Sequence, residues 1–572
     1  MKRKVCALFM AAAMLMLLLS SCKKEPVSEE VSSSAPSSAG EPEESSSRAP
    51  IPSQPPKVVE PIPVPIAEVG IYAPAGDVKA VSLAVPTRTK LPKWRGANFL
   101  NFFIKGQSTG YGDNGREFNE ADFALMQKLG FNFIRLAMDY RYFVPGDYDT
   151  VDMAMIGRLD TAVEYAIKYN IHLQLCFHSC PGKTAGKTDG MNLFQNTANK
   201  DTPTRYPQDL AAAYWGMMAK RYKDIPNNIM SFNLFNEPSD SVTDQQYLAA
   251  TNKMLAAIEK ESPGRFIILD GAWDNTRVLP ISYATKPNIA SSIHIYQPTA
   301  LCTLGESGKK MPDGFTSPVT WPMTNYLNGT IFAPYKANLY FKGTMNTVIT
   351  NKNGFAAGGV TIRLVEQSSS NTATILADGV NVGTIAMSGS VAGGKDFHSD
   401  GNIIPAGTKK VEVFLSSGDW VTFDSITISG VKTLATASSW MGYPGAPVEV
   451  TESRKTDHNF FHETVLTPWA DFKKQHGTDY MAGEWGISSS VPHTARIEYI
   501  KDLMKALGDQ PWAVWEFKGG IYAFINQSGT GMAGVETVDM PITVDGKTTT
   551  YKISKDMYNA VKPYLDNPCD LG

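Results

Sequence analysis

From about residue 91 onward, the apolar positions of this chain follow two alternating patterns. Short runs are apolar at nearly every position, as in 171–177 and 229–235. Between them, apolar residues recur every three or four positions, as in Leu159, Val163 and Ile167. The first pattern is typical of strands buried on both faces, and the second of amphipathic helices. Their alternation predicts βα units whose strands run parallel.

The runs of strand type number eight, which is the number that closes a barrel of βα units around one core. We therefore predict an α/β fold, a (β/α)₈ TIM barrel. The expected strands span 98–104, 132–136, 171–177, 229–235, 266–269, 291–296, 480–483 and 512–515.

The interval between the sixth and seventh expected strands is far longer than one βα unit needs. Its middle part, 331–430, contains strand-like segments such as 410–415 and the hairpin signals Asn353-Gly354 and Asp378-Gly379, with no helical periodicity. This composition predicts an all-β, sandwich-like domain inserted between barrel strands 6 and 7. The barrel then consists of residues 66–330 and 431–572.

The N-terminus carries a basic start followed by an apolar run, 5–19, that is shorter than a membrane span and typical of a secretory signal. The run ends in Leu19-Ser20-Ser21-Cys22, which resembles the bacterial lipobox, so we expect a signal peptide over 1–21 and a lipid on Cys22. Residues 22–65 are rich in Ser, Pro and Glu and predict a flexible tether. We therefore expect an exported lipoprotein, anchored to the membrane at the bacterial cell surface or extracellular.

The net charge and the residue pattern argue against some classes of partner and cofactor. The net charge of −3 over 572 residues argues against a nucleic-acid partner, which usually requires a basic surplus. No cluster of oxygen ligands indicates a metal ion, and we expect no cofactor and a monomeric protein. The pairing of the four cysteines outside the N-terminal segment stays open; these are Cys176, Cys180, Cys302 and Cys569.

Two glutamates directly follow segments that we expect to be strands. Glu237 comes after 231–236, and Glu484 comes after 480–483. Barrel enzymes carry their catalytic groups at the C-terminal ends of strands. Hydrolysis of a glycosidic bond requires two carboxyl groups that flank the bond. Either glutamate alone is better explained as a surface or turn residue, but their shared position at strand ends predicts a catalytic pair. Glu516 is the main rival carboxylate, and its position along the strand is expected to turn it the other way.

Around these glutamates the sequence resembles glycoside hydrolase family 5, the cellulase-type barrels, over roughly 94–525 apart from the insertion. The resemblance rests on short motifs in the family's order. They are Arg95-Gly96-Ala97-Asn98, the segment 130–136 with Arg135, Phe177-His178, Asn236-Glu237-Pro238, His294-Ile295-Tyr296, Gly483-Glu484-Trp485-Gly486 and Trp515. One departure is Trp485, where many members carry Phe.

The resemblance implies that Glu237 is the acid/base and Glu484 the nucleophile, with carboxyl groups about 5 Å apart. It also implies a set of substrate-binding residues: Arg135, His178, Asn236, His294, Tyr296 and Trp515. We expect Glu237 to be protonated at rest because Glu484 beside it is ionised. Arg135 and the Tyr296 hydroxyl are the expected partners that keep Glu484 ionised.

The resulting functional hypothesis is a retaining endo-β-glycanase that acts on β-linked polysaccharide by a two-glutamate double displacement, with β-1,4-glucan favoured. Mannan, mixed-linkage glucan and β-1,3-glucan are alternatives on the same scaffold. A hypothesis of a different class is a catalytically inactive, carbohydrate-binding surface lipoprotein. The insertion, with Trp420, resembles carbohydrate-binding β-sandwich modules, but a purely structural insert explains it equally well.

Overall fold

The computed structural model describes residues 63–103, 118–185, 188–239, 242–272, 277–297, 299–306, 319, 321, 330–332, 347–418, 420–434, 448–452, 461–527 and 535–571. The expected signal peptide, Cys22 and nearly all of the expected tether lie outside the described residues. None of the helices within the described ranges is long and apolar enough to cross a membrane.

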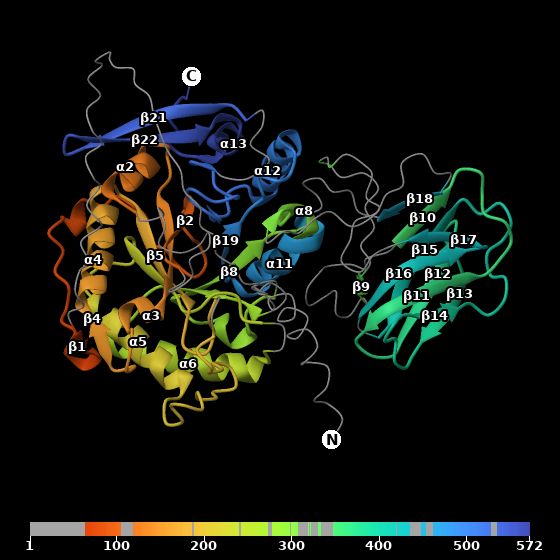
Figure 1. Ribbon diagram of the computed structural model, residues 1–572, viewed down its shortest axis with the longest axis horizontal. Helices are drawn as coiled ribbons and strands as arrows, with labels where there is room; N and C mark the ends of the chain where they lie inside the picture. Colours follow the sequence, from red (N-terminus) through yellow and green to blue (C-terminus); the bar gives the residue numbers. More distant parts are fainter. Residues whose placement is uncertain are drawn as a thin grey trace, which may run out of the picture. The chain divides into compact units, whose positions relative to one another are not determined.

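Eight parallel strands form a closed barrel (Figure 1), which confirms the predicted (β/α)₈ fold. Their order around the barrel is β19-β20-β2-β3-β5-β6-β7-β8. The strands are β2 (Arg95–Phe102), β3 (Phe133–Asp139), β5 (His172–Ser179), β6 (Met230–Asn233), β7 (Ile267–Asp270), β8 (Ile289–Ile295), β19 (Tyr480–Trp485) and β20 (Trp512–Val514).

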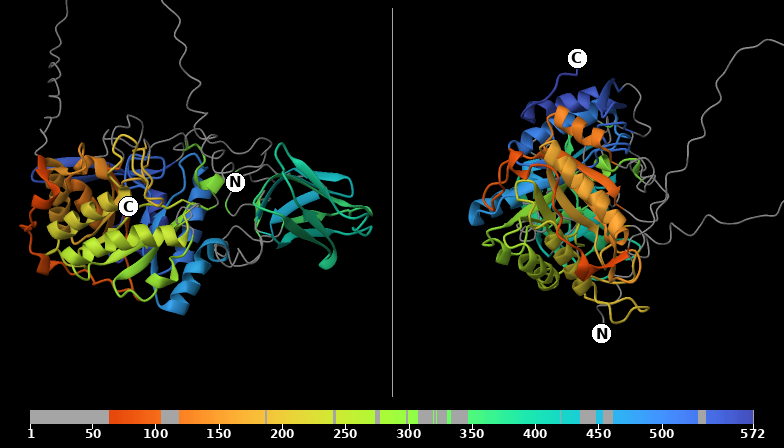
Figure 2. Two further views of the ribbon diagram at one scale, coloured as in Figure 1. Left: turned by 90° about the horizontal axis from the view of Figure 1, so that it is seen from below. Right: turned by 90° about the vertical axis from the view of Figure 1, so that its left-hand side faces the viewer.

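Helices cover the outside of the barrel, as two further views show for the longer crossover helices (Figure 2). The stripe of Leu159, Val163 and Ile167 is buried, as its spacing predicts. Local signals define the helix ends: Gly130, with a φ of +86°, follows the first barrel helix. The helices are α2 (Glu120–Lys128), α3 (Tyr140–Phe143), α4 (Met153–Lys168), α5 (Pro207–Arg221), α6 (Asp244–Glu261), α8 (Thr299–Cys302), α11 (Thr467–His476), α12 (His493–Leu507) and α13 (Lys555–Val561).

The barrel interior changes from apolar to polar along the strands. An apolar layer near the N-terminal ends of the strands includes Phe133 on β3 and Ile268 on β7. Because side chains on a strand alternate between its two faces, the residue two positions later points the same way. Those residues are Arg135 and Asp270, and both are fully buried. The C-terminal half of the interior therefore holds a buried polar cluster above an apolar base.

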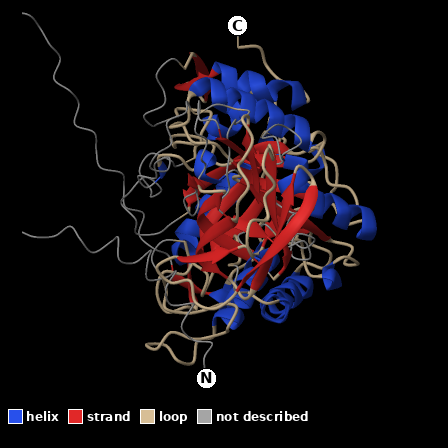
Figure 3. Cartoon of the chain, turned by 90° about the vertical axis from the view of Figure 1, so that its right-hand side faces the viewer, coloured by secondary structure: helices blue, strands red, loops and turns tan. Residues whose placement is uncertain are grey.

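Between β8 and β19 the chain forms two antiparallel sheets with a core of their own. Figure 3 shows these strands in red, joined by loops. One sheet has the order β13-β12-β15-β10-β18, and the other β14-β11-β16-β17 with β9 beside β16. The strands are β9 (Thr330–Phe332), β10 (Thr347–Asn351), β11 (Val360–Gln367), β12 (Asn371–Ala377), β13 (Val380–Met387), β14 (Lys395–His398), β15 (Lys410–Ser417), β16 (Trp420–Ile428), β17 (Val431–Leu434) and β18 (Val448–Glu452).

Two of these strands, β17 and β18, lie beyond residue 430, where the expected insertion ends. β18 is a full member of its sheet, because Val448–Glu452 pairs in register with Asn351–Thr347 of β10. Elsewhere, β1 (Pro63–Pro65) pairs with β4 (Thr150–Asp152), and β21 (Thr537–Val544) forms a hairpin with β22 (Lys547–Ser554).

Candidate active site

The structure brings the predicted site residues into one connected cluster at the C-terminal ends of the barrel strands. Four lie on strands: Arg135 on β3, His178 on β5, His294 on β8 and Glu484 on β19. The other four lie in the segments that follow strands: Asn236 and Glu237 shortly after β6, Tyr296 directly after β8 and Trp515 directly after β20.

Arg135 is the centre of the cluster, and its side chain is fully buried. Its guanidinium donates to Glu484 Oε1 at 2.6 Å and to Asn236 Oδ1 at 2.8 Å. It also donates to Asn98 Oδ1 at 2.9 Å and to Asn233 Oδ1 at 2.9 and 3.2 Å. A buried charge needs such a full set of partners. The planar fork therefore holds the nucleophile candidate and the neighbour of the acid/base candidate in one fixed arrangement.

Glu484 is held by two donors of different kinds. Arg135 binds one carboxylate oxygen, and the Tyr296 hydroxyl donates to the other at 2.9 Å. Burial raises the pKa of Glu484 above its usual range, because the positive charges of His294 and Arg135 only partly offset the loss of water. Burial and the two carboxylates nearby raise the pKa of Tyr296 well above its usual range, so this phenol is a neutral donor.

Glu237 is placed differently. Its backbone has a φ of +40°, a left-handed conformation that is uncommon for a residue with a side chain. Its N–H donates to Asp270 Oδ2 at 3.2 Å, and its Oε1 lies 2.6 Å from His294 Nδ1. Its side chain is 27% exposed, whereas that of Glu484 is 4% exposed. Glu237 thus faces the solvent side of the cluster.

His294 lies among three carboxylates. Its Nδ1 is 2.6 Å from Glu237 and 3.6 Å from Glu484, and its Nε2 is 3.4 Å from Asp270. Burial lowers the pKa of His294, but the charges of Glu484, Asp270 and Glu237 raise it more, so it lies above its usual value. Burial raises the pKa of Glu237, but the His294 charge at hydrogen-bond distance outweighs burial and lowers it.

These directions differ from the expectation that repulsion by Glu484 keeps Glu237 protonated at rest. That reasoning considered the two carboxylates alone and left out the imidazole between them. His294 Nδ1 lies 2.6 Å from Glu237 Oε1, so the two groups are close enough to share a proton, and the directions of their pKa shifts favour the histidine. A proton on His294 would lie one short hydrogen bond from Glu237, where an acid catalyst needs it.

A carboxylate oxygen of Glu237, one of Glu484 and a ring nitrogen of His294 all lie within 4.8 Å of one another. Of the described residues, this is the group of His, Cys, Asp and Glu side chains whose spacing could hold a metal ion. Arg135 already places a positive charge against Glu484. The donor set is therefore balanced by protein cations, and it does not require a metal ion for charge compensation.

Aromatic side chains border the cluster. The rings of His178 and Trp515 lie 5.2 Å apart, and Phe103 contacts both. Burial, Arg135 and Lys183 lower the pKa of His178 well below its usual value, so this imidazole is neutral. The rival carboxylate of Glu516 lies against Gly520, where an added Cβ would meet Glu516 Oε1 at 1.3 Å. Glu516 thus stays outside the group formed by Glu237, His294 and Glu484.

Three residues that bind the cluster together were not singled out from the sequence: Asn98, Asn233 and Asp270. Asn98 lies within β2 and Asn233 is the last residue of β6, and an amide there carries no local signal of its role. Asp270 offered a clearer signal, because it directly follows the apolar run 267–269 in the same way that Glu484 follows its own run. It contacts Asn233, Arg135, His294 and the Glu237 backbone.

Residues 96–328 match the family model described as cellulase (glycosyl hydrolase family 5). The match covers the barrel from β2 to β8, so this part of the chain is similar to that family. Glu237 lies inside the matched range, and Glu484 lies beyond it.

The chain is also similar to three named enzymes over part of its length. A β-xylosidase of Phanerodontia chrysosporium is 31% identical over 189 residues, which is 31% of this chain and 37% of the relative. A glucan 1,3-β-glucosidase of Schwanniomyces occidentalis is 25% identical, with 36% and 48% covered. Endoglucanase 3 of Fibrobacter succinogenes is 24% identical, with 50% and 43% covered. The chain thus spans less than half the length of each of these relatives.

A crystal structure of a glycoside hydrolase resembles this chain with a TM-score of 0.50 at 16% identity. The alignment covers 83% of this chain and 99% of that one, and it shows a shared fold.

Proposed function

We propose that this protein is a retaining β-glycanase in which Glu484 is the nucleophile and Glu237 the acid/base. The observation that carries the proposal is the approach of the two carboxylates to within 4.8 Å at the open end of the barrel. Retaining enzymes hold their carboxyl groups about 5–5.5 Å apart, whereas inverting enzymes leave about 6.5–9.5 Å for a water molecule. One oxygen of each carboxylate lies within 4.8 Å of the other, which fits the shorter, retaining separation better than the longer one.

In the first step, Glu484 attacks the anomeric carbon and forms a glycosyl ester while the bond to the leaving sugar breaks. The leaving oxygen takes the proton of the Glu237–His294 pair through Glu237. As Glu484 becomes an ester, it loses the charge that helped to keep the proton on His294, so the proton transfer and the attack support each other. In the second step, Glu237 takes a proton from water, and the resulting hydroxide displaces Glu484.

The remaining residues serve binding. The Asn236 amide oxygen is engaged by Arg135, which orients the amide group beside Glu237. Such an amide donates to the sugar hydroxyl next to the anomeric carbon, a bond that strengthens in the transition state. His178 and Trp515 form the aromatic and imidazole surface beneath the reacting sugar.

We propose β-1,4-glucan as the substrate, with endo action. The relatives have names that span an endoglucanase, a β-xylosidase and glucan 1,3-β-glucosidases. Mannan, mixed-linkage glucan and β-1,3-glucan therefore belong in the test.

We further propose that Cys22 carries a lipid that anchors the exported protein at the cell surface. Membrane fractionation of a Cys22→Ser variant tests the anchor, and release of the variant into the soluble fraction is expected.

The function is tested by measuring reducing ends released from a panel of defined polysaccharides by the full chain. Glu484→Gln and Glu237→Gln are the inactive controls, and Glu498→Gln, a surface residue paired with Lys501, is the matched one. Activity on a β-glycan that Glu484→Gln abolishes and Glu498→Gln retains supports the proposal. Equal activity of Glu484→Gln and the parent chain would contradict it.

A further inference from the structure

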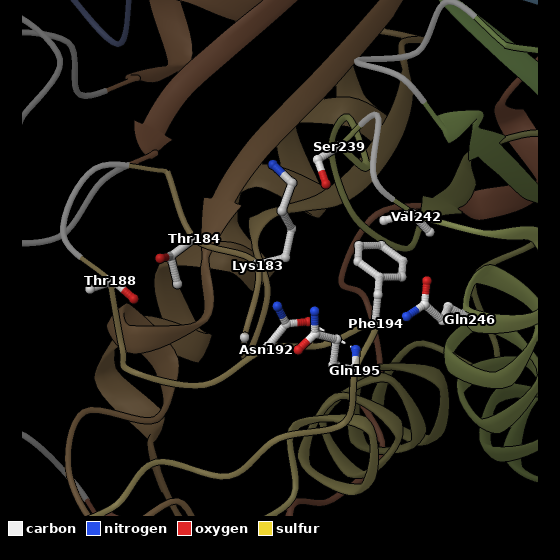
Figure 4. Close-up of a pocket in the computed structure, with 10 residues that line it drawn as sticks. Lys183, Thr184, Thr188, Asn192, Phe194, Gln195, Ser239, Val242 and Gln246 are labelled. Carbon is white, nitrogen blue, oxygen red and sulfur yellow. Dashed lines mark hydrogen bonds between the residues drawn. The ribbon is translucent and has the colours of Figure 1, made fainter. Parts of the chain in front are cut away.

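Beside the catalytic cluster lies a pocket of about 270 Å³ that the mechanism does not use. Its walls come from the loop after β5, the loop after β6 and the start of α6 (Figure 4). Polar side chains without charge dominate the lining, and Figure 4 shows the ring of Phe194 among them. The uncharged polar residues are Thr184, Thr188, Asn192, Gln195, Ser239 and Gln246.

Of the described residues that line the pocket, Lys183 is the charged one, and none of them is a carboxylate. The Lys183 ammonium makes no hydrogen bond or ion pair with the part of the chain that the structure describes. It is close enough to act electrostatically on the catalytic group, because its charge contributes to lowering the pKa of Glu237. An ammonium with open donors beside a reacting centre favours an anionic group on the ligand.

The loop that presents Lys183 is firmly built. Gly182 has a φ of +74°, and a Cβ on it would lie 2.4 Å from the backbone nitrogen of Leu193, so only glycine fits. Leu193 donates to the Gly182 carbonyl at 3.0 Å, and Asp189 accepts from the Gly182 N–H at 2.7 Å and from the Tyr140 hydroxyl at 3.1 Å. These bonds fix the backbone on both sides of the pocket.

The position of the pocket relative to Glu237 and Glu484 indicates on which side of the scissile bond it lies. Glu237 protonates the leaving group, so the leaving sugar lies on the side of Glu237, and Ser239 of the pocket follows Glu237 by two residues. No residue of β19 or β20, which position Glu484 and Trp515, contributes to the lining. The pocket is therefore on the leaving-group side of the scissile bond.

We propose that this pocket is a subsite for the leaving sugar and that Lys183 selects glycans whose sugar carries a carboxylate there. This inference rests on the proposed glycanase function and adds the substituent that the site prefers. The uncharged polar residues bind hydroxyl groups, Phe194 supplies an apolar surface, and Lys183 pairs with the acid. The expected ligand class is a β-glycan with uronic acid or other carboxylate substituents.

The test compares two soluble β-1,4-glucans of equal degree of substitution, carboxymethylcellulose and the neutral hydroxyethylcellulose. For turnover, we divide kcat/KM on carboxymethylcellulose by kcat/KM on hydroxyethylcellulose. This ratio is measured for the parent chain, Lys183→Met, Lys183→Arg and Lys200→Met. Lys200 is an exposed lysine outside the pocket lining. We expect Lys183→Met to lower the ratio about three- to tenfold, as loss of a partly exposed charge-assisted bond implies. Lys183→Arg and Lys200→Met are expected to keep it within about twofold.

Binding is measured separately by affinity electrophoresis in the two polymers, in Glu484→Gln with and without Lys183→Met. A preference for the acidic polymer that weakens with salt and disappears with Lys183→Met supports the subsite. An unchanged preference in Lys183→Met overturns the subsite and leaves the glycanase function standing. If binding shows the preference but the parent chain releases no reducing ends from any polysaccharide, the proposed function and the leaving-sugar role both fail, and Lys183 remains only a residue that binds acidic glycans.

Discussion

Glu484 and Glu237 lie at the same end of one barrel, but the protein holds them in different ways. Glu484 is almost fully buried and receives two hydrogen bonds from Arg135 and Tyr296. Glu237 is 27% exposed, has a left-handed backbone, and depends on His294 and on the Asp270 contact to its N–H. A nucleophile needs one fixed attacking geometry, whereas an acid/base must exchange protons with leaving group and water.

The difference also concerns what lies around each carboxylate. Glu484 lies on β19, and the strand residues Arg135 on β3 and His294 on β8 lie beside it. Glu237 lies next to the loops that form the Lys183 pocket. Mutations on the Glu484 side should therefore affect every substrate alike, whereas mutations on the Glu237 side should depend on the leaving group.

The largest expected effects separate the two glutamates by leaving group. Glu484→Gln should lower kcat by a factor of about 10⁴ to 10⁶ on every substrate, because no ester forms. Glu237→Gln should cost about 10² to 10⁴ on oligosaccharides. With 2,4-dinitrophenyl glycosides, whose leaving group needs no proton, Glu237→Gln should retain a fast first step and show a burst of phenol. Stopped-flow absorbance measures the burst; equal losses on both substrate types would contradict the assigned roles.

The next effect concerns Arg135, which contacts both Glu484 and Asn236, the residue before Glu237. Arg135→Lys keeps the positive charge but loses the planar guanidinium group with its several N–H donors. Several of the amide oxygens of Asn98, Asn233 and Asn236 then stay buried without a donor. Each unpaired buried group costs about 1–3 kcal/mol, and we expect a loss of about 3 kcal/mol or more in the free energy of unfolding. Chemical denaturation followed by tryptophan fluorescence measures it.

The matched control for Arg135→Lys is Arg205→Lys, a surface residue paired with Asp149. An exposed ion pair contributes about 0–1 kcal/mol, so this variant should unfold with the parent chain. If the two variants were equally stable, the central role of Arg135 would be wrong.

A smaller effect is expected on the Glu237 side alone. Asp270→Asn removes one of the three charges that raise the pKa of His294, so that pKa should fall. The Glu237–His294 pair then loses its proton at a lower pH, and the basic limb of the kcat/KM profile should move down by about one pH unit, equal to about 1.4 kcal/mol. In the parent chain that limb should lie above about 6.5, the usual histidine value.

The control for Asp270→Asn is Asp209→Asn on the exposed face of α5, where the charge pairs with Lys253. Its pH profile should match that of the parent chain. A basic limb that stays in place in Asp270→Asn would show that Asp270 does not position the proton of the pair, whatever its effect on activity at one pH.

The smallest expected effect is that of Tyr296→Phe, which removes the hydroxyl donor to Glu484 and keeps the ring. One hydrogen bond to a charged group contributes about 1.5 kcal/mol, so kcat should fall about tenfold on all substrates, including dinitrophenyl glycosides. Tyr206→Phe, an exposed tyrosine, is the control. A loss seen only with poor leaving groups would place the Tyr296 hydroxyl on the acid/base side instead.

The sequence was sufficient for the barrel and for the strand-end residues, because both follow from the periodicity of the chain. An apolar run that ends in Asn236-Glu237 or in Glu484 can be recognised from spacing alone, and the barrel then brings such residues together. The roles of the individual residues stay predictions. Trp515 and Tyr296 were predicted through the resemblance, since an aromatic residue at a strand end is otherwise as consistent with packing.

The proton balance of the site was not predictable from the sequence. It depends on a distance of 2.6 Å between His294 and Glu237 and on the presence of Asp270, which come from strands far apart along the chain. The pocket was missed for a related reason. Lys183 and Asn192 lie in a loop without periodicity, where the backbone bonds of Gly182 and Asp189 set the geometry.

The most direct measurement of the central claim is the anomeric configuration of the first product. Proton NMR recorded during the first minutes of hydrolysis distinguishes the β-anomer from the α-anomer before mutarotation mixes them. Because the approach of the two carboxylates to within 4.8 Å favours retention, a β-glycan should release the β-anomer first. Initial release of the α-anomer would show direct attack by water and would contradict the assignment of Glu484 as nucleophile.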